Sequence, residues 1–204
     1  MSKEQGVLDF VLENVPAGDP AALIEAVDSY KSDNGISMMN LGAKKGAVVD
    51  KALKESGATR VLELGSYFGY SITRMAHLIG PAGKLITVDA DDHRHAVSSQ
   101  MVQHAGLEDR VSLLLGRAED LIPALEGAFD FVLIDHYADN YLSDLQLIEA
   151  EGLIRPGSVV AADNVVAHRP TVDGYLEHVR NSGLYDSTLH EVGSDGVEIS
   201  VRLG

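Results

Sequence analysis

The sequence contains no cysteine and no tryptophan, and aromatic residues make up only 5% of its 204 positions. The lack of cysteine excludes disulfide bonds, thiolate catalysis and cysteine-ligated metal sites. Apolar runs are short as well, and none approaches the roughly 18–20 residues that a membrane-spanning helix needs. The N-terminus shows no basic segment followed by an apolar one, so no signal peptide is indicated. We therefore expect a cytoplasmic protein without a membrane partner.

Basic residues are also few. The chain has 16 Lys and Arg against 31 Asp and Glu, which gives a formal net charge of −15. The basic residues are scattered, and an acidic surface repels phosphate backbones, so we expect no nucleic-acid partner. Hydrophobic residues account for 45% and charged residues for 23%, as in ordinary globular proteins. The length fits a single domain over residues 1–204.

Short apolar runs alternate with amphipathic segments along most of the chain. Residues 20–30, which follow an Asp19-Pro20 cap, and residues 43–55 predict N-terminal helices. The runs that predict buried strands are 60–64, 84–88, 110–115, 129–134 and 158–161, and the helical segments between and after them are 71–78, 94–105, 118–125, 141–149 and 171–179. This alternation predicts an α/β fold with a Rossmann-like, doubly wound sheet that is mostly parallel.

The C-terminal part departs from the alternation. Two strand-like runs, 184–191 and 197–202, are separated only by Gly193-Ser194-Asp195-Gly196. That spacing leaves room for a hairpin and none for a crossover helix. The sheet is therefore expected to finish with an antiparallel hairpin.

The first predicted strand runs into Gly65-Ser66-Tyr67-Phe68-Gly69. A Gly-x-x-x-Gly turn lets the backbone approach a ligand, but it differs from the Gly-x-Gly-x-x-Gly turn that cradles a dinucleotide pyrophosphate. Glu63 would repel phosphate and suits a cationic group, such as the amino group of a methionine moiety. Asp89 ends the next strand, where an acid accepts the ribose hydroxyls of an adenosine. Either acid alone could simply cap a helix; together with the turn they indicate a nucleoside with a cationic end.

The third predicted strand is followed by Ala118 and Glu119. In this topology that strand end lies against the adenine, so Ala118 could pack on the ring and Glu119 could accept its exocyclic amine. Capping of the next helix by Glu119 explains the same residues equally well, and both interpretations stay open.

Oxygen-bearing side chains follow the fourth and fifth predicted strands. Asp135 comes after the fourth strand, and Asp163 and Asn164 come after the fifth. Neighbouring strand ends meet in the crevice where open α/β sheets bind ligands. Two carboxylates and one amide oxygen form a hard donor set that suits Mg²⁺, and no Cys or His pair competes for zinc. Helix capping is again the alternative for Asp163 and Asn164 taken alone.

Several longer runs resemble catechol O-methyltransferases, which are class I methyltransferases dependent on S-adenosylmethionine and Mg²⁺. The resemblance extends from about residue 16 to residue 201. The runs that carry it, in order and at the family's spacing, are PAGDPAALIEAVDSY, MNLGAKKGAVVD, VLELGSYFGYS, GRAEDLIP, DHYADNYLSDL, GLIRPGSVVAADNV and DGYLEHVRNS. The DHY and ADN segments narrow the resemblance from class I methyltransferases in general to this family.

The resemblance implies a role for each matching position. The implied Mg²⁺ ligands are Asp135, Asp163 and Asn164, and Asn164 would also contact the substrate. The implied S-adenosylmethionine contacts are Glu63, Gly65, Tyr67, Ser71 and Asp89, with Met39 and Leu41 covering the ligand and Asp135 and His136 beside it. A family glutamate that holds the second catechol hydroxyl has Glu191 as its nearest counterpart, after a short gap.

The chain departs from the family at the position of the general base. Ala138 stands where the family has a lysine, and an alanine cannot accept a proton. His168 stands at a family proline; a histidine has a suitable pKa for base catalysis, although a solvent-facing loop histidine is the alternative. Ser37 and Tyr137 replace two tryptophans of mammalian members, which implies a wider and more polar substrate pocket.

The sequence thus predicts methyl transfer from S-adenosylmethionine to one hydroxyl of a Mg²⁺-chelated, small-molecule catechol. Ala138 leaves three accounts open: an engineered loss of the base, a natural enzyme with a weaker or relocated base, and a non-catalytic S-adenosylmethionine-binding homologue. A caffeoyl-coenzyme A-type O-methyltransferase is a further alternative. An NAD-dependent oxidoreductase is disfavoured by the glycine spacing and by Glu63.

Overall fold

The computed structural model describes residues 2–204. The elements, in chain order, are α1 (Lys3–Asn14), α2 (Pro20–Asp33), α3 (Gly42–Ser56), β1 (Arg60–Leu64), α4 (Tyr70–Leu78), β2 (Lys84–Asp89), α5 (Asp92–His104), β3 (Val111–Leu115), α6 (Ala118–Leu121), η1 (Ile122–Ala124), β4 (Phe131–Ile134), η2 (Ala138–Asn140), α7 (Tyr141–Ala150), β5 (Val159–Ala162), α8 (Asp173–Asn181), β6 (Tyr185–Val192) and β7 (Asp195–Arg202).

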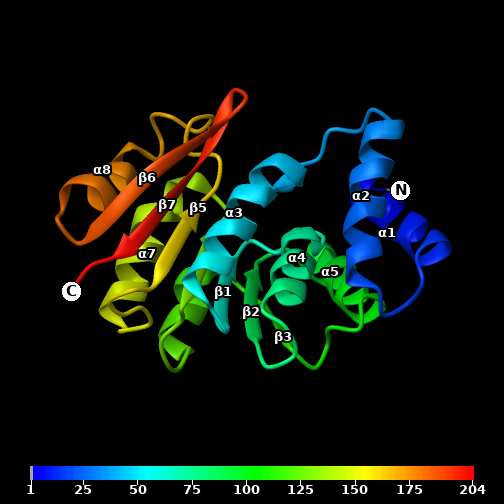
Figure 1. Cartoon of the computed structure of the whole chain (residues 1–204), viewed down its shortest axis with the longest axis horizontal. Helices are drawn as coiled ribbons and strands as arrows, with labels where there is room; N and C mark the ends of the chain where they lie inside the picture. Colours follow the sequence, from blue (N-terminus) through cyan, green and yellow to red (C-terminus); the bar gives the residue numbers. More distant parts are fainter. Residues whose placement is uncertain (1) are drawn as a thin grey trace.

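All the strands belong to one seven-stranded sheet with the order β3-β2-β1-β4-β5-β7-β6. The strands β1 to β5 pair in parallel, β7 pairs antiparallel with β5, and β6 pairs antiparallel with β7 (Figure 1). The predicted doubly wound sheet with an antiparallel C-terminal hairpin is therefore confirmed. The strand order reverses between β1 and β4, and in open α/β sheets that switch point is where ligands bind.

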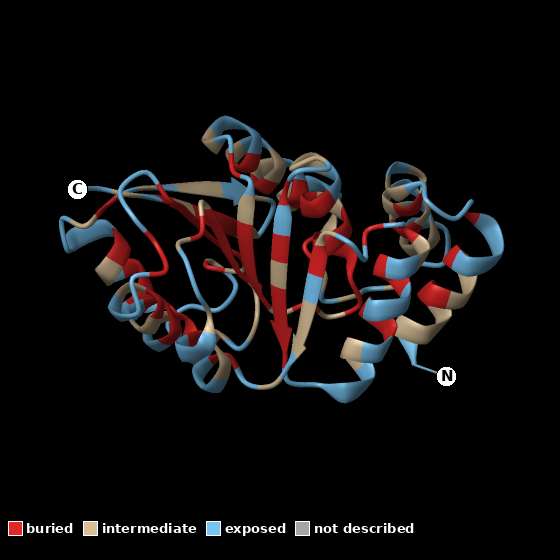
Figure 2. Ribbon diagram, turned by 90° about the horizontal axis from the view of Figure 1, so that it is seen from below, coloured by how far each residue is buried: buried red, intermediate tan, exposed pale blue. Residues whose placement is uncertain are grey.

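Helices cover both faces of the sheet, which explains the nearly continuous apolar strands. Val61 and Leu85 pack into the cluster formed with α1 to α5, whereas Leu62 and Ile134 pack into the cluster formed with α7 and α8. Figure 2 shows the buried strands lying between layers of helices. The helix residues that face the sheet are buried as well. No helix within residues 2–204 is long and apolar enough to span a bilayer.

Several boundaries differ from the sequence predictions, and helix α1 is not among the predicted elements. Three of the differences have a local cause. The hairpin turn is only Gly193-Ser194, because Asp195 and Gly196 already pair with β6. The helix predicted at 118–125 divides into α6 and η1, where Pro123 cannot donate a backbone hydrogen bond. Helix α5 begins two residues before the predicted start, because the side chain of Asp91 caps it by accepting from Arg94 N at 2.9 Å.

Candidate functional site

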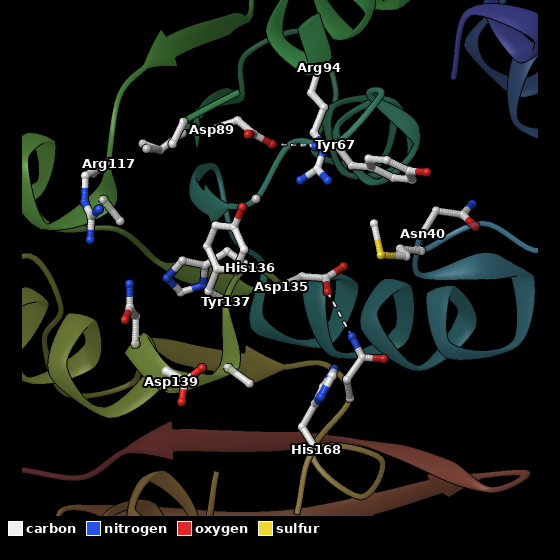
Figure 3. Close-up of a pocket in the computed structure, with 18 of the residues that line it drawn as sticks. Asn40, Tyr67, Asp89, Arg94, Arg117, Asp135, His136, Tyr137, Asp139 and His168 are labelled. Carbon is white, nitrogen blue, oxygen red and sulfur yellow. Dashed lines mark hydrogen bonds between the residues drawn. The ribbon is translucent and has the colours of Figure 1, made fainter. Parts of the chain in front are cut away.

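A cavity of about 620 Å³ opens at the carboxyl edge of the parallel strands. Figure 3 shows side chains from both halves of the sheet directed into it. The sequence-predicted residues that line the cavity are Met39, Gly65, Tyr67, Asp89, Ala118, Asp135, His136, Tyr137, Ala138, Asn164 and His168.

The glycine turn after β1 is required by packing as much as by any ligand. Gly65 has φ of 105°, and a Cβ added there would lie 2.2 Å from the carbonyl oxygen of Asp135. Gly69 has φ of 95°, and its Cβ would press on Ser98 and Met101 of α5. Larger residues at these two positions would force the turn away from β4 and from α5.

Asp89 organises the same turn through its carboxylate. One oxygen accepts from the backbone N–H of Tyr67 at 2.9 Å, and the other accepts from the backbone N–H of Asp91 at 3.0 Å. Figure 3 shows the first of these bonds at the cavity wall. A carboxylate has about four acceptor sites, so both oxygens can accept further hydrogen bonds from a ligand in the cavity.

Glu63 lies completely buried behind the turn. Its Oε2 accepts from the hydroxyl of Thr87 at 2.6 Å, whereas its Oε1 has no hydrogen-bond partner among residues 2–204. Burial raises the pKa of Glu63 to about 7; the hydroxyls of Ser71 and Thr87 oppose the shift, and the charge of Asp89 adds to it. A buried carboxylate with one unpartnered oxygen is suited to bind a cation or a hydrogen-bond donor.

A second polar group gathers where β4 and β5 end. Asn164 has φ of 59° and donates from Nδ2 to Oδ1 of Asp135 at 3.2 Å. Lys45, which comes from α3, donates to Oδ2 of Asp163 at 2.8 Å and to Oδ1 of Asn164 at 2.6 Å. Its third acceptor is Oδ2 of Asp195, at 2.9 Å on β7. Oxygens from the end of β5 and from the start of β7 thus surround one positive charge.

The carboxylates of this group destabilise one another. Burial and the negative charge of Asp163 raise the pKa of Asp135 well above its usual value, and burial also raises the pKa of Asp163 against the opposing effect of Lys45. Burial disfavours the charged form of Lys45, but its contacts with Asp163 and Asp195 outweigh burial and raise its pKa. The excess of buried negative charge favours a cation at this place.

The donor chemistry of the group fits a hard divalent ion. Asp163 and Asn164 already direct one oxygen each at a single cationic nitrogen, and the other carboxylate oxygen of Asp163 is buried without a partner. Within residues 2–204 no cluster of three or more His, Cys, Asp or Glu is arranged around a metal position. The set here has two carboxylates and an amide, which is a composition that suits Mg²⁺ completed by water or substrate oxygens.

Only some of the residues predicted to lie near the adenine line the cavity. His136 lines the cavity, stacks on Tyr141 and contacts Oδ2 of Asp144 through Nε2 at 2.6 Å. Ala118 also lines the cavity. Glu119 is exposed and accepts from Arg117 at 2.8 Å, so Arg117 rather than Glu119 lies at the wall.

Other predicted residues lie apart from the cavity. Leu41 and Ser71 are buried behind its wall, whereas Ser37 is exposed and does not line it. Glu191 is exposed on β6, paired with Gly196, and also does not line the cavity. The hairpin acid that reaches the polar group is Asp195 instead.

The cavity mouth carries exposed apolar side chains. Met39 is 70% exposed and Tyr137 is 67% exposed, and both line the opening. Ala138, at the start of η2, and His168, in the loop after β5, line the wall near Asp135 and Asn164. The Ala138 methyl group provides no proton acceptor at that place.

Residues 15–180 match the family model described as O-methyltransferase, so the chain belongs to the O-methyltransferase family. Among its relatives is catechol O-methyltransferase from Bos taurus, 40% identical over 190 residues that cover 91% of this chain and 69% of that protein. This similarity confirms the resemblance found in the sequence. The relative from Mus musculus with the same name is also 40% identical, over 92% of this chain and 71% of that protein.

Solved structures share the fold. The O-methyltransferase TomG from Streptomyces achromogenes, in complex with SAM, superposes with a TM-score of 0.78 over 100% of both chains. At 22% identity this likeness concerns the fold alone.

Proposed function

We propose that this chain transfers the methyl group of S-adenosylmethionine to one hydroxyl of a catechol-type small molecule, with Mg²⁺ as the metal. The observation that supports this proposal best is that one cavity has two polar ends. Asp89 lines one end, with the buried Glu63 behind the turn; Asp135 and Asn164 line the other, with the buried Asp163 next to Asn164. The names of the bovine and murine relatives support the same substrate class.

The donor end supports a sulfonium amino acid joined to a nucleoside. Asp89 can accept from both ribose hydroxyls, and the buried Oε1 of Glu63 can accept from an ammonium group. Gly65 brings the backbone of the turn to the cavity wall, and Tyr67 and Met39 line the adjoining side. S-adenosylmethionine supplies an already activated methyl group, and TomG, which shares the fold, is described in complex with it.

At the acceptor end, Asp135, Asp163 and Asn164 would hold the metal. When bound, Mg²⁺ supplies positive charge that lowers the pKa of a phenol, which is near 10 in water. Asn164 is fixed by its bond to Asp135 and by a left-handed backbone, so its side chain can also orient a substrate hydroxyl. Met39 and Tyr137 at the mouth would cover an aromatic ring and limit the access of water.

The protein itself offers no strong base at the position of the family lysine. Ala138 cannot take the phenolic proton, so the proton would pass to solvent or to His168, which lines the same wall. Orienting the two substrates then accounts for most of the catalysis that the residues provide. A catalytically impaired or non-catalytic S-adenosylmethionine-binding protein is the second candidate, and Ala138 is the observation that favours it.

The test is a methylation assay with catechol, S-adenosylmethionine and Mg²⁺, repeated with EDTA and with a panel of vicinal diphenols that includes caffeoyl-coenzyme A. We expect methylated product by mass spectrometry, and its loss with EDTA. Donor binding without product at any pH up to 9 would favour the binding-protein alternative. If the protein methylates caffeoyl-coenzyme A in preference to simple catechols, the coenzyme A ester is the substrate instead.

A further inference from the structure

Lys45 contacts the same oxygens that are proposed to hold the metal. Its Nζ is 2.8 Å from Asp163 and 2.6 Å from Asn164, and its side chain is only 15% exposed. Mg²⁺ binds oxygen at about 2.0–2.1 Å and needs a lone pair from each ligand. An ammonium group donating to both of these oxygens therefore competes with the metal for its ligands.

A third contact gives Lys45 a second place to bind. Asp195 accepts from it at 2.9 Å through Oδ2, while Oδ1 of Asp195 accepts from the backbone N–H of Ala167 at 3.0 Å. This second bond holds the Asp195 carboxylate in place independently of Asp163 and Asn164. Lys45 can thus leave these two side chains and keep one charged partner.

We propose that Lys45 is the built-in counter-ion of the metal-free site, released from Asp163 and Asn164 when a divalent cation enters and retained by Asp195. This inference rests on the proposed function, because it concerns the same metal ligands. It explains how the buried Asp163 and the half-buried Asp135 can remain near each other without metal, since removing the partner of a buried charge is strongly destabilising. The observed affinity for Mg²⁺ then reflects the difference between the free energy of binding Mg²⁺ and that of binding the Lys45 ammonium group at the same oxygens.

The first experiment measures Mg²⁺ binding by titration calorimetry, without S-adenosylmethionine or catechol. Lys45→Met keeps the length of the side chain and removes its charge. Because two charge-assisted hydrogen bonds no longer have to be broken, we expect Lys45→Met to bind Mg²⁺ about tenfold more tightly than wild type, or better. The matched control is Lys44→Met, which removes the exposed lysine next to it on α3 and should bind Mg²⁺ as wild type does.

Thermal unfolding gives a readout that does not depend on calorimetric heats. In EDTA, Lys45→Met should melt below wild type and below Lys44→Met, because the buried Asp163 and the half-buried Asp135 lose their counter-ion. On adding Mg²⁺ its melting temperature should rise by more than that of wild type, since a tighter ligand stabilises more at the same concentration.

Asp195→Asn tests whether the contact between Asp195 and Lys45 retains Lys45 when the metal binds. Without the Asp195 charge, Lys45 should remain on Asp163 and Asn164, and Mg²⁺ should bind several-fold more weakly than to wild type. The same change made in the Lys45→Met background should have a smaller effect, and the difference between the two measures the coupling. Equal effects in both backgrounds would overturn the retaining role of Asp195.

The outcomes separate this inference from the proposed function. If wild type and Lys45→Met bind Mg²⁺ equally, and Asp163→Ala abolishes binding in both, the metal site stands and the counter-ion role of Lys45 is refuted. If neither protein binds Mg²⁺ at any concentration tested, the metal assignment fails and this inference fails with it. Binding to Lys45→Met but not to wild type would support both.

Discussion

Replacing Glu63 by glutamine changes one buried charge and little of the shape around it. The carboxylate is completely buried, with Oε2 bonded to Thr87 and Oε1 without a partner among residues 2–204. Its pKa is raised from 4.5 to about 7, mainly by burial. The ligand-free fold therefore bears the cost of ionising Glu63, and Glu63→Gln removes that cost.

The sign and size follow from linkage between proton binding and folding. The folded protein holds the Glu63 proton more tightly than the unfolded chain does, so the cost is absent below about pH 4.5 and grows as the pH rises to about 7. A shift of this size corresponds to roughly 3 kcal/mol at 1.36 kcal/mol per pKa unit. The stability of Glu63→Gln relative to wild type should rise by about that amount between pH 5 and pH 8.

The assay is urea unfolding of ligand-free protein at several pH values. The informative quantity is how the difference in unfolding free energy between Glu63→Gln and wild type changes with pH. An imperfectly paired glutamine amide changes this difference only by an amount that does not depend on pH. Glu25→Gln, at an exposed position on α2, is the control and should track wild type throughout. A stability difference between Glu63→Gln and wild type that stays constant from pH 5 to pH 8 would refute the reasoning.

The same group should control donor binding. An ammonium group favours the ionised form of Glu63, so wild type should bind S-adenosylmethionine roughly tenfold more weakly at pH 6 than at pH 7.5 and should release a proton on binding. Glu63→Gln should bind more weakly at pH 7.5 and lose most of this dependence, which calorimetry in buffers of different ionisation enthalpy can measure.

Four further changes test the remaining assignments. Asp89→Ala should cost about 1.5–3 kcal/mol of S-adenosylmethionine binding by calorimetry, and tight NAD binding by wild type would contradict this assignment. Asp163→Ala should abolish Mg²⁺-dependent catechol binding while donor affinity is largely kept; catechol affinity that is the same with and without Mg²⁺ would argue against the metal ligands. Ala138→Lys should raise kcat at pH 7–8 by roughly tenfold and flatten its rise with pH, and a folded variant that binds donor and metal but gains nothing would count against the base position. His168→Ala should leave most activity intact; if it alone removes activity, His168 is the base.

The fold could be predicted where local pattern decides it. Strands buried on both faces are almost wholly apolar, so β4 and β5 can be recognised in the sequence, and the short turn near the C-terminus permits only a hairpin there. The position of β7 between β5 and β6 could not be predicted, because strand order depends on long-range pairing. The early start of α5 depends on one capping bond from Asp91.

The candidate site divides in the same way. Glu63, Asp89 and Asp135 could be identified because each lies in or just after a predicted strand, whose end the topology brings to one edge of the sheet. Lys45 could not, because it reaches Asp163 and Asp195 across 118 and 150 residues of sequence, and nothing local marks it. The spacing of the C-terminal runs predicts Asp195 in the hairpin turn, whereas its pairing with Val192 places it at the start of β7.

The close approach of Gly65 to the carbonyl oxygen of Asp135 also affects how acceptor preference can change among homologues of this protein. The residues proposed for the donor come mainly from β1, β2 and the segments that follow them, with Met39 from the loop before α3, whereas those proposed for the metal follow β4 and β5. The two sets meet at the seam between β1 and β4, where no room exists for an added side chain. Exchanging the chain after β5 between homologues should therefore alter acceptor preference and leave donor recognition unchanged. Exchanges that separate Gly65 from its own β4 should impair both at once.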